Sequence, residues 1–427
     1  MKQYWKYVKP YLHAFIIGPI LMIVEVVGEV LMPLFLKNII DYGINENRGV
    51  SYIVMMGVAM VLTALLMMIG GTGGAYFAIK ASSGFANDLR KDMFNKIQEF
   101  SFSNIDQYST GSLITRITND VTQIQNIIQM MLRMALRAPG MFIGALIMAF
   151  SLNTKMALVI MCIIPLLALA IFFIIKTGFP RFTAMQKKLD ELNIATQENL
   201  TNIRVVKSFV REDYEEEKFD KANNELKDKT IQAIKVVIFT IPVVTLAMNI
   251  TTLAVVWFGG RQIIAGSMTT GDLTAFVNYV VQILISLMMV SIIILNSSRA
   301  LASARRINEV LRTKVDLTDE HASRKDLTVR SGKVEFRNVC FKYYKNNAKW
   351  VLEDINLVIN QGETVGIIGS TGCGKTTLVQ LIPRLYDVDQ GEVLVDGVNV
   401  RDYSLKNLRD GVSIVLQKNV LFSGTIM

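Results

Sequence analysis

The sequence has 427 residues with a formal net charge of +9; 51% of the residues are hydrophobic and only 19% are charged. Soluble globular domains carry about 25% charged residues. Together with a mean hydropathy of +0.37, this composition excludes intrinsic disorder and disfavours a single soluble domain. Long uncharged stretches alternate with charged blocks, which is typical of a membrane protein and not of a nucleic-acid-binding one. The three cysteines are too few for a disulfide framework, so we expect the polar parts to face a reducing cytosol.

Apolar stretches recur along residues 1–313, and a helix needs about 20 such residues to cross a bilayer. We predict a transmembrane domain there. Its six membrane helices are expected at residues 12–36, 52–79, 138–154, 156–175, 236–260 and 273–298. Lysine and arginine concentrate before the first span and in two long blocks, 80–137 and 176–235. This bias places the N-terminus, both blocks and the chain after the sixth span in the cytosol.

Glu25 and Glu29 lie one helical turn apart inside the first predicted span. Carboxylates within a membrane are costly and usually face a bundle interior or water. Two functional interpretations are the attraction of cationic amphiphiles and a proton relay. The third interpretation is a structural hydrogen bond to a neighbouring helix. We therefore carry both residues forward as candidate ligand-site residues.

The two charged blocks are too long to be structureless connections. Apolar residues recur in them at helical spacing, as at Leu113, Ile117 and Val121. Two antiparallel arms of about 25 residues each would reach roughly 35–40 Å into the cytosol. Residues 103–111 and 204–213 are the predicted tips of these arms, where they could contact a separate domain. The alternative is a pair of solvated arms without a partner.

A polar linker is predicted at residues 314–332, and a nucleotide-binding domain at residues 333–427. Strands are expected at 334–336, 351–359 and 364–368. The third is followed by a run that fits the P-loop pattern G-x-x-x-x-G-K-[ST] and then by a helix start. Glycines let backbone amides wrap a phosphate chain, and a helix N-terminus favours its negative charge. The predicted nucleotide-binding residues are Gly369, Ser370, Thr371, Gly372, Cys373, Gly374, Lys375, Thr376 and Thr377. In this pattern Lys375 contacts the β- and γ-phosphates and the Thr376 hydroxyl ligates Mg²⁺.

Several segments, in this order, resemble the ATP-binding cassette (ABC) exporters. They are YSTGSLITRITNDV (108–121), ENLTNIRVVKSFVREDYEEEKF (198–219), VEFRNVCFKY (334–343), VLEDINLVINQGETVGIIG (351–369), GEVLVDGVNV (391–400) and SIVLQKNVLFSGTI (413–426). The resemblance covers essentially the whole chain. It implies a half-transporter, in which a multi-pass α-helical membrane domain with long cytosolic extensions precedes an α/β P-loop nucleotide-binding domain.

The resemblance also assigns residue roles. Tyr343 takes the position of the aromatic that stacks on adenine, with Tyr344 as the alternative register. Gln417 takes the position of the Q-loop glutamine, which contacts Mg²⁺ or the attacking water. The implied cofactors are ATP and Mg²⁺, with Lys375 and Gln417 as catalytic residues and Thr376 and Gln417 as metal ligands. The signature segment, Walker B aspartate, catalytic glutamate and switch histidine of the family do not occur before Met427. We therefore expect a C-terminally truncated nucleotide-binding domain, inactive as an ATPase on its own.

The implied function is ATP-driven export of hydrophobic or amphipathic compounds across the cytoplasmic membrane by alternating access. The substrates would be drugs, or else lipids or peptides, with Glu25 and Glu29 in the candidate substrate site and no role for nucleic acid. The expected partner is a second half-transporter. The segments EVVGEVLMPLF (25–35) and LRAP (136–139) resemble one subunit of the bacterial heterodimeric multidrug exporters. A non-hydrolysing, ATP-binding regulatory or channel-like membrane subunit is the alternative.

Overall fold

The computed structural model describes residues 4–320, 322–344, 349–415 and 423–425, apart from some side chains inside three apolar helical stretches. The chain divides into two compact units. The first unit comprises Met1–Gly84 and Asn126–Ser298, and the second comprises Phe85–Gln125 and Arg299–Met427. Three helices, α3, α6 and α11, continue from one unit into the other.

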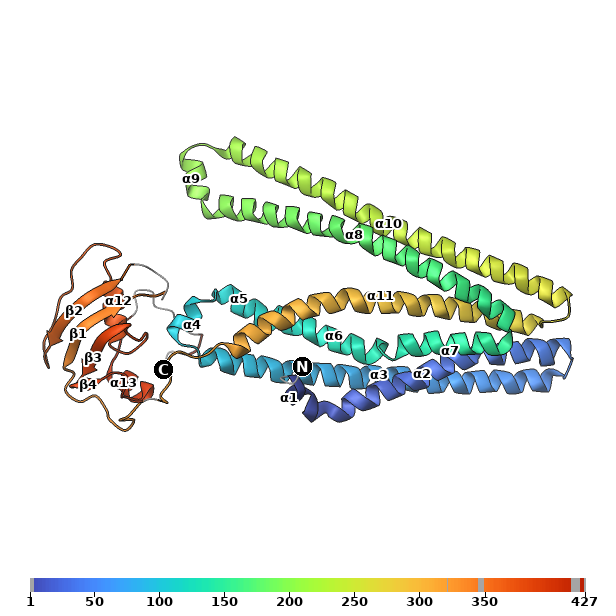
Figure 1. Ribbon diagram of the computed structural model, residues 1–427, viewed down its shortest axis with the longest axis horizontal. Coiled ribbons are helices and arrows are strands. Elements are labelled where there is room, and N and C mark those ends of the chain that lie inside the picture. Colours follow the sequence, from blue (N-terminus) through green and yellow to red (C-terminus); the bar gives the residue numbers. More distant parts are fainter. Residues whose placement is uncertain (1–3, 321, 345–348, 416–422, 426–427) are drawn as a thin grey trace. The chain divides into compact units, whose positions relative to one another are not determined.

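Long helices build the first unit. They are α2 (Leu12–Asn38), α3 (Val50–Gln98), α6 (Val121–Met134), α7 (Arg137–Leu152), α8 (Thr154–Thr201), α10 (Glu212–Ile264) and α11 (Thr270–Arg312). The shorter helices are α1 (Trp5–Val8), η2 (Lys9–Tyr11), the π-helix η3 (Ile39–Asn45) and α9 (Ile203–Ser208). Helices α8 and α10 run side by side in opposite directions, with α9 at their far end (Figure 1). The predicted second arm is therefore a helical hairpin.

Four helical stretches among the described residues are long and apolar enough to cross a membrane. They are Trp5–Asn45, Val50–Gln98, Thr110–Leu152 and Thr270–Val290. These stretches contain the first and second predicted spans and overlap most of the third and sixth, which were expected to run to residues 154 and 298. The fourth and fifth lie in α8 and α10, where part of the side chains is outside the described set, so the six-span topology stays a prediction.

The core of the first unit joins α2, α7, α10 and α11 through apolar side chains. Its members include Val26, Val30, Met141, Ala145, Ala149, Val255, Phe276, Tyr279 and Ile283. The hydroxyl of Tyr279 donates to the carbonyl of Val30 over 2.8 Å, which satisfies a polar group inside this core. Helix α3 approaches α2 closely because Gly70 has no side chain. A Cβ there would lie 2.8 Å from the carbonyl oxygen of Leu21.

The second unit begins with the first predicted arm. The arm contains α4 (Phe102–Asp106), α5 (Thr110–Thr115) and the π-helix η4 (Arg116–Asp120), which leads into α6. Ser101 and Ser109 cap α4 and α5 by accepting hydrogen bonds from backbone amides, and Asn104 completes a capping box with Ser101. Hydroxyl side chains at these positions satisfy the free amides of a helix start. The predicted tip 103–111 therefore covers most of α4, the connection and the first residues of α5.

The nucleotide-binding part of this unit carries an antiparallel four-stranded sheet in the order β2-β1-β3-β4. Its elements are β1 (Val334–Phe341), β2 (Leu352–Ile359), α12 (Lys375–Leu381), β3 (Gln390–Val395), β4 (Val398–Asn399) and α13 (Leu405–Gly411). Strand β1 lies in the interior of the sheet because Val334 pairs with both Ile359 of β2 and Val395 of β3. Both helices contribute side chains to the core beneath it.

The strand predicted at residues 364–368 is not formed. Within the described residues this segment makes no ladder with any strand, and Ile368 is 99% exposed. An apolar run acquires strand geometry only when another strand hydrogen-bonds to it. The four paired strands belong to a separate antiparallel layer, so the prediction was wrong for the described structure. The strand predicted at 334–336 does form, and it extends to Phe341.

Candidate nucleotide site

The P-loop turns sharply between Gly369 and the start of α12. Gly372 and Gly374 have φ angles of +86° and +92°, which residues with a Cβ rarely adopt. Gly374 is the N-cap of α12, and a Cβ there would meet the Leu352 side chain at 2.8 Å and the Val351 carbonyl oxygen at 3.2 Å. Glycine is therefore required at this position for both its conformation and its size.

Lys375 folds back over the loop. Its Nζ donates to the carbonyl oxygens of Gly369 and Ser370, each at 2.8 Å, and lies 3.6 Å from Cys373 Sγ. The ammonium group is thus already centred on the loop, where phosphate oxygens would replace the two carbonyls as its acceptors. This position is compatible with phosphate binding by a lysine that acts as a point charge, which stays a prediction.

The two threonines after Lys375 face different surroundings. Thr376 is exposed, whereas Thr377 is 5% exposed and its hydroxyl is hydrogen-bonded to the Tyr343 hydroxyl at 2.8 Å. Among the described residues no group of three or more histidine, cysteine or acidic side chains could hold a metal ion. A single hydroxyl ligand still fits Mg²⁺, which usually takes its other ligands from nucleotide phosphates and water. Gln417 lies outside the described residues, so its predicted role stays untested.

Tyr343 stands beside the start of α12. Its ring contacts those of Phe341 and Tyr386 edge-on, at centroid distances of 5.0 and 5.2 Å. The side chain is 37% exposed, so part of the ring is accessible to a ligand, while the neighbouring Tyr344 is 58% exposed. The ring contacts and the link to Thr377 fix Tyr343 near the loop. This placement favours Tyr343 over Tyr344 as the adenine platform, although the stacking itself stays a prediction.

A cavity of about 730 Å³ lies next to Tyr343, between α4 and the nucleotide-binding part of the second unit. Its lining includes Ser103, Asp106, Gln107, Asp316, Lys342, Tyr343, Tyr344, Tyr386, Asp389 and Arg401. Sequence reasoning did not find this cavity, because α4 and Tyr386 are separated by some 280 residues. Their juxtaposition is a property of the folded unit alone.

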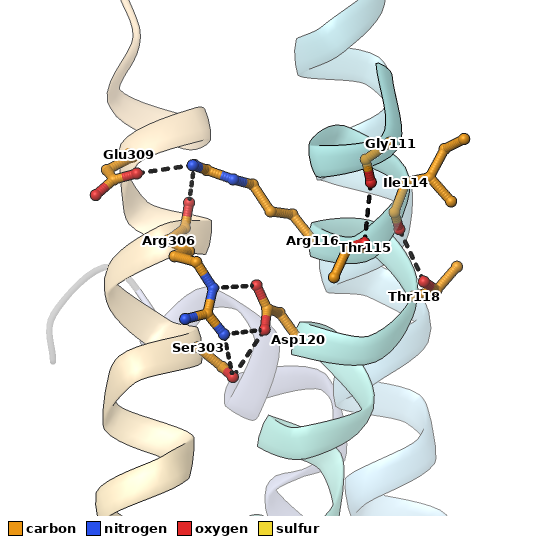
Figure 2. A network of polar contacts seen from close by, with 9 residues as sticks. All are labelled: Gly111, Ile114, Thr115, Arg116, Thr118, Asp120, Ser303, Arg306 and Glu309. Atoms are coloured by element: carbon orange, nitrogen blue, oxygen red, sulfur yellow. Dashed lines mark hydrogen bonds and ion pairs between the residues drawn. The ribbon is translucent and has the colours of Figure 1, made fainter. Parts of the chain in front are cut away.

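Polar contacts also bind the first arm to the end of α11 (Figure 2). Asp120, which is 2% exposed, accepts hydrogen bonds from Arg306 Nε at 2.8 Å and from the Ser303 hydroxyl at 2.9 Å. Arg116 reaches the Glu309 carboxylate at 2.9 Å and the Arg306 carbonyl at 2.8 Å. Burial by itself would raise the pKa of Asp120, but the hydrogen bonds from Arg306 and Ser303 outweigh it and lower that pKa.

In the first unit the predicted pair of carboxylates shares one arginine. Arg137 binds Glu25 at 3.1 Å through Nη1 and Glu29 at 2.5 Å through Nη2. Glu25 and Arg137 border a cavity of about 460 Å³ that is also lined by Met67, Met68, Gly71, Thr72 and Arg133, whereas Glu29 does not line it. The ion pairs link α2 to α7, which favours a structural role for the glutamates. A substrate role stays untested.

The tip of the second arm is apolar and exposed. Phe209 is 72% exposed and Val210 is 81% exposed, and both follow α9 directly. Val210 also has a φ of +49°, which is rare for a β-branched residue. A cavity of about 630 Å³ is lined by Val205, Val206, Phe209 and Tyr214, among others. The predicted tip 204–213 is thus a hydrophobic end on a polar arm.

Comparisons with known proteins agree with this arrangement. Residues 15–288 match the family described as ABC transporter transmembrane region, and residues 352–427 match the family described as ABC transporter. The uncharacterized ABC transporter ATP-binding protein YfiB of Bacillus subtilis is 38% identical over 426 residues, which is 100% of this chain and 74% of that protein.

Two further relatives carry functional names. The putative multidrug export ATP-binding/permease protein YgaD of Bacillus subtilis is 31% identical over 440 residues, covering 100% of this chain and 74% of that protein. The ATP-dependent lipid A-core flippase of Desulfotalea psychrophila is 31% identical over 347 residues, covering 81% of this chain and 60% of that protein. These names describe the relatives, and they indicate the range of cargo handled by similar chains.

Proposed function

Since the chain belongs to the ABC transporter family, as a multi-pass membrane domain followed by part of a nucleotide-binding domain, we propose that it exports small hydrophobic or amphipathic compounds from the cytosol. ATP with Mg²⁺ would bind at Gly369–Thr377, with Lys375 on the phosphates and Thr376 as a metal ligand. The observation that carries this proposal is the Lys375 ammonium, held 2.8 Å from two loop carbonyls at the start of α12. Nucleotide binding can drive transport only if it stabilises one conformation over another.

Efflux measurements test this proposal. Bacterial cells that express the full-length protein containing this chain, together with its proposed partner half-transporter, are loaded with a hydrophobic cationic dye, and dye loss is followed after glucose is added. We expect faster loss than in control cells, and we expect Lys375→Ala to abolish the difference at equal membrane abundance. A Lys375→Ala variant that exports as fast as the unchanged protein would contradict an ATP-driven mechanism at this loop.

We further propose that the working unit pairs this chain with a second half-transporter in the cytoplasmic membrane. The exposed Phe209 and Val210 at the end of the second arm support it, because a large apolar patch on a polar arm is typical of a protein interaction site. Phe209→Asp and Val210→Asp should lower the recovered fraction of dimer in lipid nanodiscs, measured by mass photometry. An unchanged dimer fraction would exclude this surface from the interface.

Within the proposed substrate site, Glu25 would act on cargo in the cavity that it borders with Met67 and Met68, and Glu29 would act through Arg137, which it shares with Glu25. The ion pairs with Arg137 reduce their attraction for a cation. If the Glu25 carboxylate nevertheless contacts cargo, Glu25→Gln should slow the export of a cationic dye more than that of a neutral one, because only the cation loses an attraction. Equal effects on both dyes would leave the glutamates with the structural role alone.

The alternative function is an ATP-binding regulatory or channel-like subunit that does not hydrolyse ATP. The membrane domain and the P-loop are compatible with it. Substrate-stimulated ATP turnover by the assembled protein in nanodiscs separates the two functions. Turnover with export supports the transporter, whereas ATP-dependent ion conductance without turnover supports the channel-like subunit.

A further inference from the structure

Tyr386 lies between the predicted adenine platform and the tip of the first arm. It follows α12 and is 8% exposed. On one side its ring meets Tyr343 edge-on, with centroids 5.2 Å apart and an interplanar angle of 88°. On the other side it meets Phe102 of α4, with centroids 6.0 Å apart. A single buried ring thus touches both a nucleotide-site residue and the arm.

The Tyr386 hydroxyl adds a polar contact to α4. It donates a hydrogen bond to Asp106 Oδ2 over 2.7 Å, at the last residue of the helix. Burial raises the pKa of the Tyr386 phenol, and the Asp106 carboxylate raises it further, so the group stays protonated and remains a donor at physiological pH. Hydrogen bonds with one ionised partner are shorter and stronger than neutral ones. The position of α4 therefore depends on where the Tyr386 ring is held.

Two other contacts tie α4 to the chain after α11, and neither includes Tyr343 or a P-loop residue. The Ser103 hydroxyl donates to Asp316 at 2.6 Å, and Asn104 Nδ2 donates to the Lys314 carbonyl at 3.1 Å. Tyr343, in contrast, reaches the start of α12 through its hydroxyl contact with Thr377. The Tyr343–Tyr386–Asp106 series is thus a direct connection between the platform ring and α4.

We propose that Tyr386 is a positioning residue through which α4 responds to the base of a bound nucleotide, and not only to its phosphates. The inference rests on the proposed ATP site at Gly369–Thr377. It states how the protein would detect the base of the nucleotide bound at that site. A base stacked on Tyr343 restricts that ring, the edge-on contact restricts Tyr386, and the hydrogen bond to Asp106 orders α4. Phosphates alone reach Tyr343 only through the Thr377 hydroxyl, so they should restrict its ring less than a stacked base does.

Hydrogen-exchange mass spectrometry of the full chain in lipid nanodiscs tests this inference. The peptide covering residues 101–108 is followed without nucleotide, with Mg²⁺ and ATP, and with Mg²⁺ and tripolyphosphate, which has no base. Because exchange reports local opening, we expect ATP to slow exchange about fivefold and tripolyphosphate to have less than half of that effect. Equal protection by the two ligands would overturn the role of the base.

The Tyr386→Phe variant removes the hydroxyl and keeps the ring. It should lose most of the ATP-dependent protection of α4 while its ATP affinity, measured by displacement of a fluorescent ATP analogue, changes less than about threefold, because the P-loop contacts are intact. The matched control Tyr344→Phe removes a neighbouring exposed hydroxyl and should keep the protection. Asp106→Ala should reproduce the loss from the other side of the hydrogen bond.

The outcomes separate this inference from the proposed function. If the unchanged chain fails to bind ATP, the proposed nucleotide site is wrong, and this inference fails with it. If ATP binds and protects α4 equally in Tyr386→Phe, Asp106→Ala and the unchanged chain, only the role of Tyr386 is overturned. Loss of protection in both variants, with ATP affinity kept, supports it.

Discussion

Replacing Asp120 tests how much its buried ion pair with Arg306 stabilises the contact between the first arm and the end of α11. Asp120 is 2% exposed and its partner Arg306 is 46% exposed at the side chain. A hydrogen bond to a charged group contributes about 1.5–3 kcal/mol, and the half-exposed guanidinium regains water when the pair is broken. We therefore expect a coupling energy of about 1.5–2 kcal/mol between Asp120→Asn and Arg306→Gln. The second contact, Arg116 with Glu309, provides the control, because Glu309 is 57% exposed and exposed pairs contribute only about 0.2–1 kcal/mol.

The assay is a double-mutant cycle on the unfolding free energy, measured by pulse proteolysis in urea. Because the pKa of folded Asp120 is lowered, its contribution is complete above the usual carboxyl pKa of about 3.9. It is lost as the pH falls through the lower folded value, so the coupling should be constant from pH 5 to pH 8. A coupling energy below about 0.5 kcal/mol, or equal values for the two pairs, would refute the claim that the buried pair holds the arm to α11.

Three further results are expected. Lys375→Ala should weaken binding of a fluorescent ATP analogue about 10–100-fold, the loss expected for one charge-assisted contact to phosphate, and an unchanged affinity would contradict its placement on the phosphates. Maleimide should label the exposed Cys373 faster than the buried Cys340, and saturating ATP should suppress labelling of Cys373 in peptide maps; unaltered labelling would argue against nucleotide in the loop. Burial alone would raise the pKa of Asp396, but hydrogen bonds from the Ser331 hydroxyl and three backbone amides lower it to about 2. Asp396→Asn should therefore cost about 1–2 kcal/mol in urea unfolding above pH 4, after allowance for solvent screening. That cost should vanish as the pH falls towards 2, and a pH-independent cost would contradict the reasoning.

Features that depend only on residues close together in the sequence could be predicted. The P-loop requires eight adjacent positions, and α12 begins at Lys375 as that pattern indicates. The helical arms follow from apolar spacing along a single segment. The tip 103–111 was placed correctly at the end of the first arm, although its division into α4 and α5 depends on the local caps at Ser101 and Ser109.

Features that depend on distant partners could not be predicted in the same way. Arg137 neutralises Glu29 across 108 residues, and Arg306 reaches Asp120 across 186. The sequence does not show which residue a charged side chain will pair with, because many opposite charges along the chain are equally suitable. The strand prediction at 364–368 was wrong for the same reason. An apolar run shows that a segment could be buried, but it becomes a strand only when a second strand hydrogen-bonds to it.

The arginine shared by two glutamates has a mechanical consequence for α2 and α7. Glu25 and Glu29 are four residues apart, so their positions are separated along the helix axis by about 6 Å, slightly more than one helical turn. Sliding α2 past α7 by that amount would move one carboxylate out of reach of Arg137 and bring the other to the place it left. An ion pair would exist at both ends of the travel, whereas pulling the helices apart sideways would break both at once. The ion pairs therefore permit α2 to slide along α7 and oppose the sideways separation of the two helices.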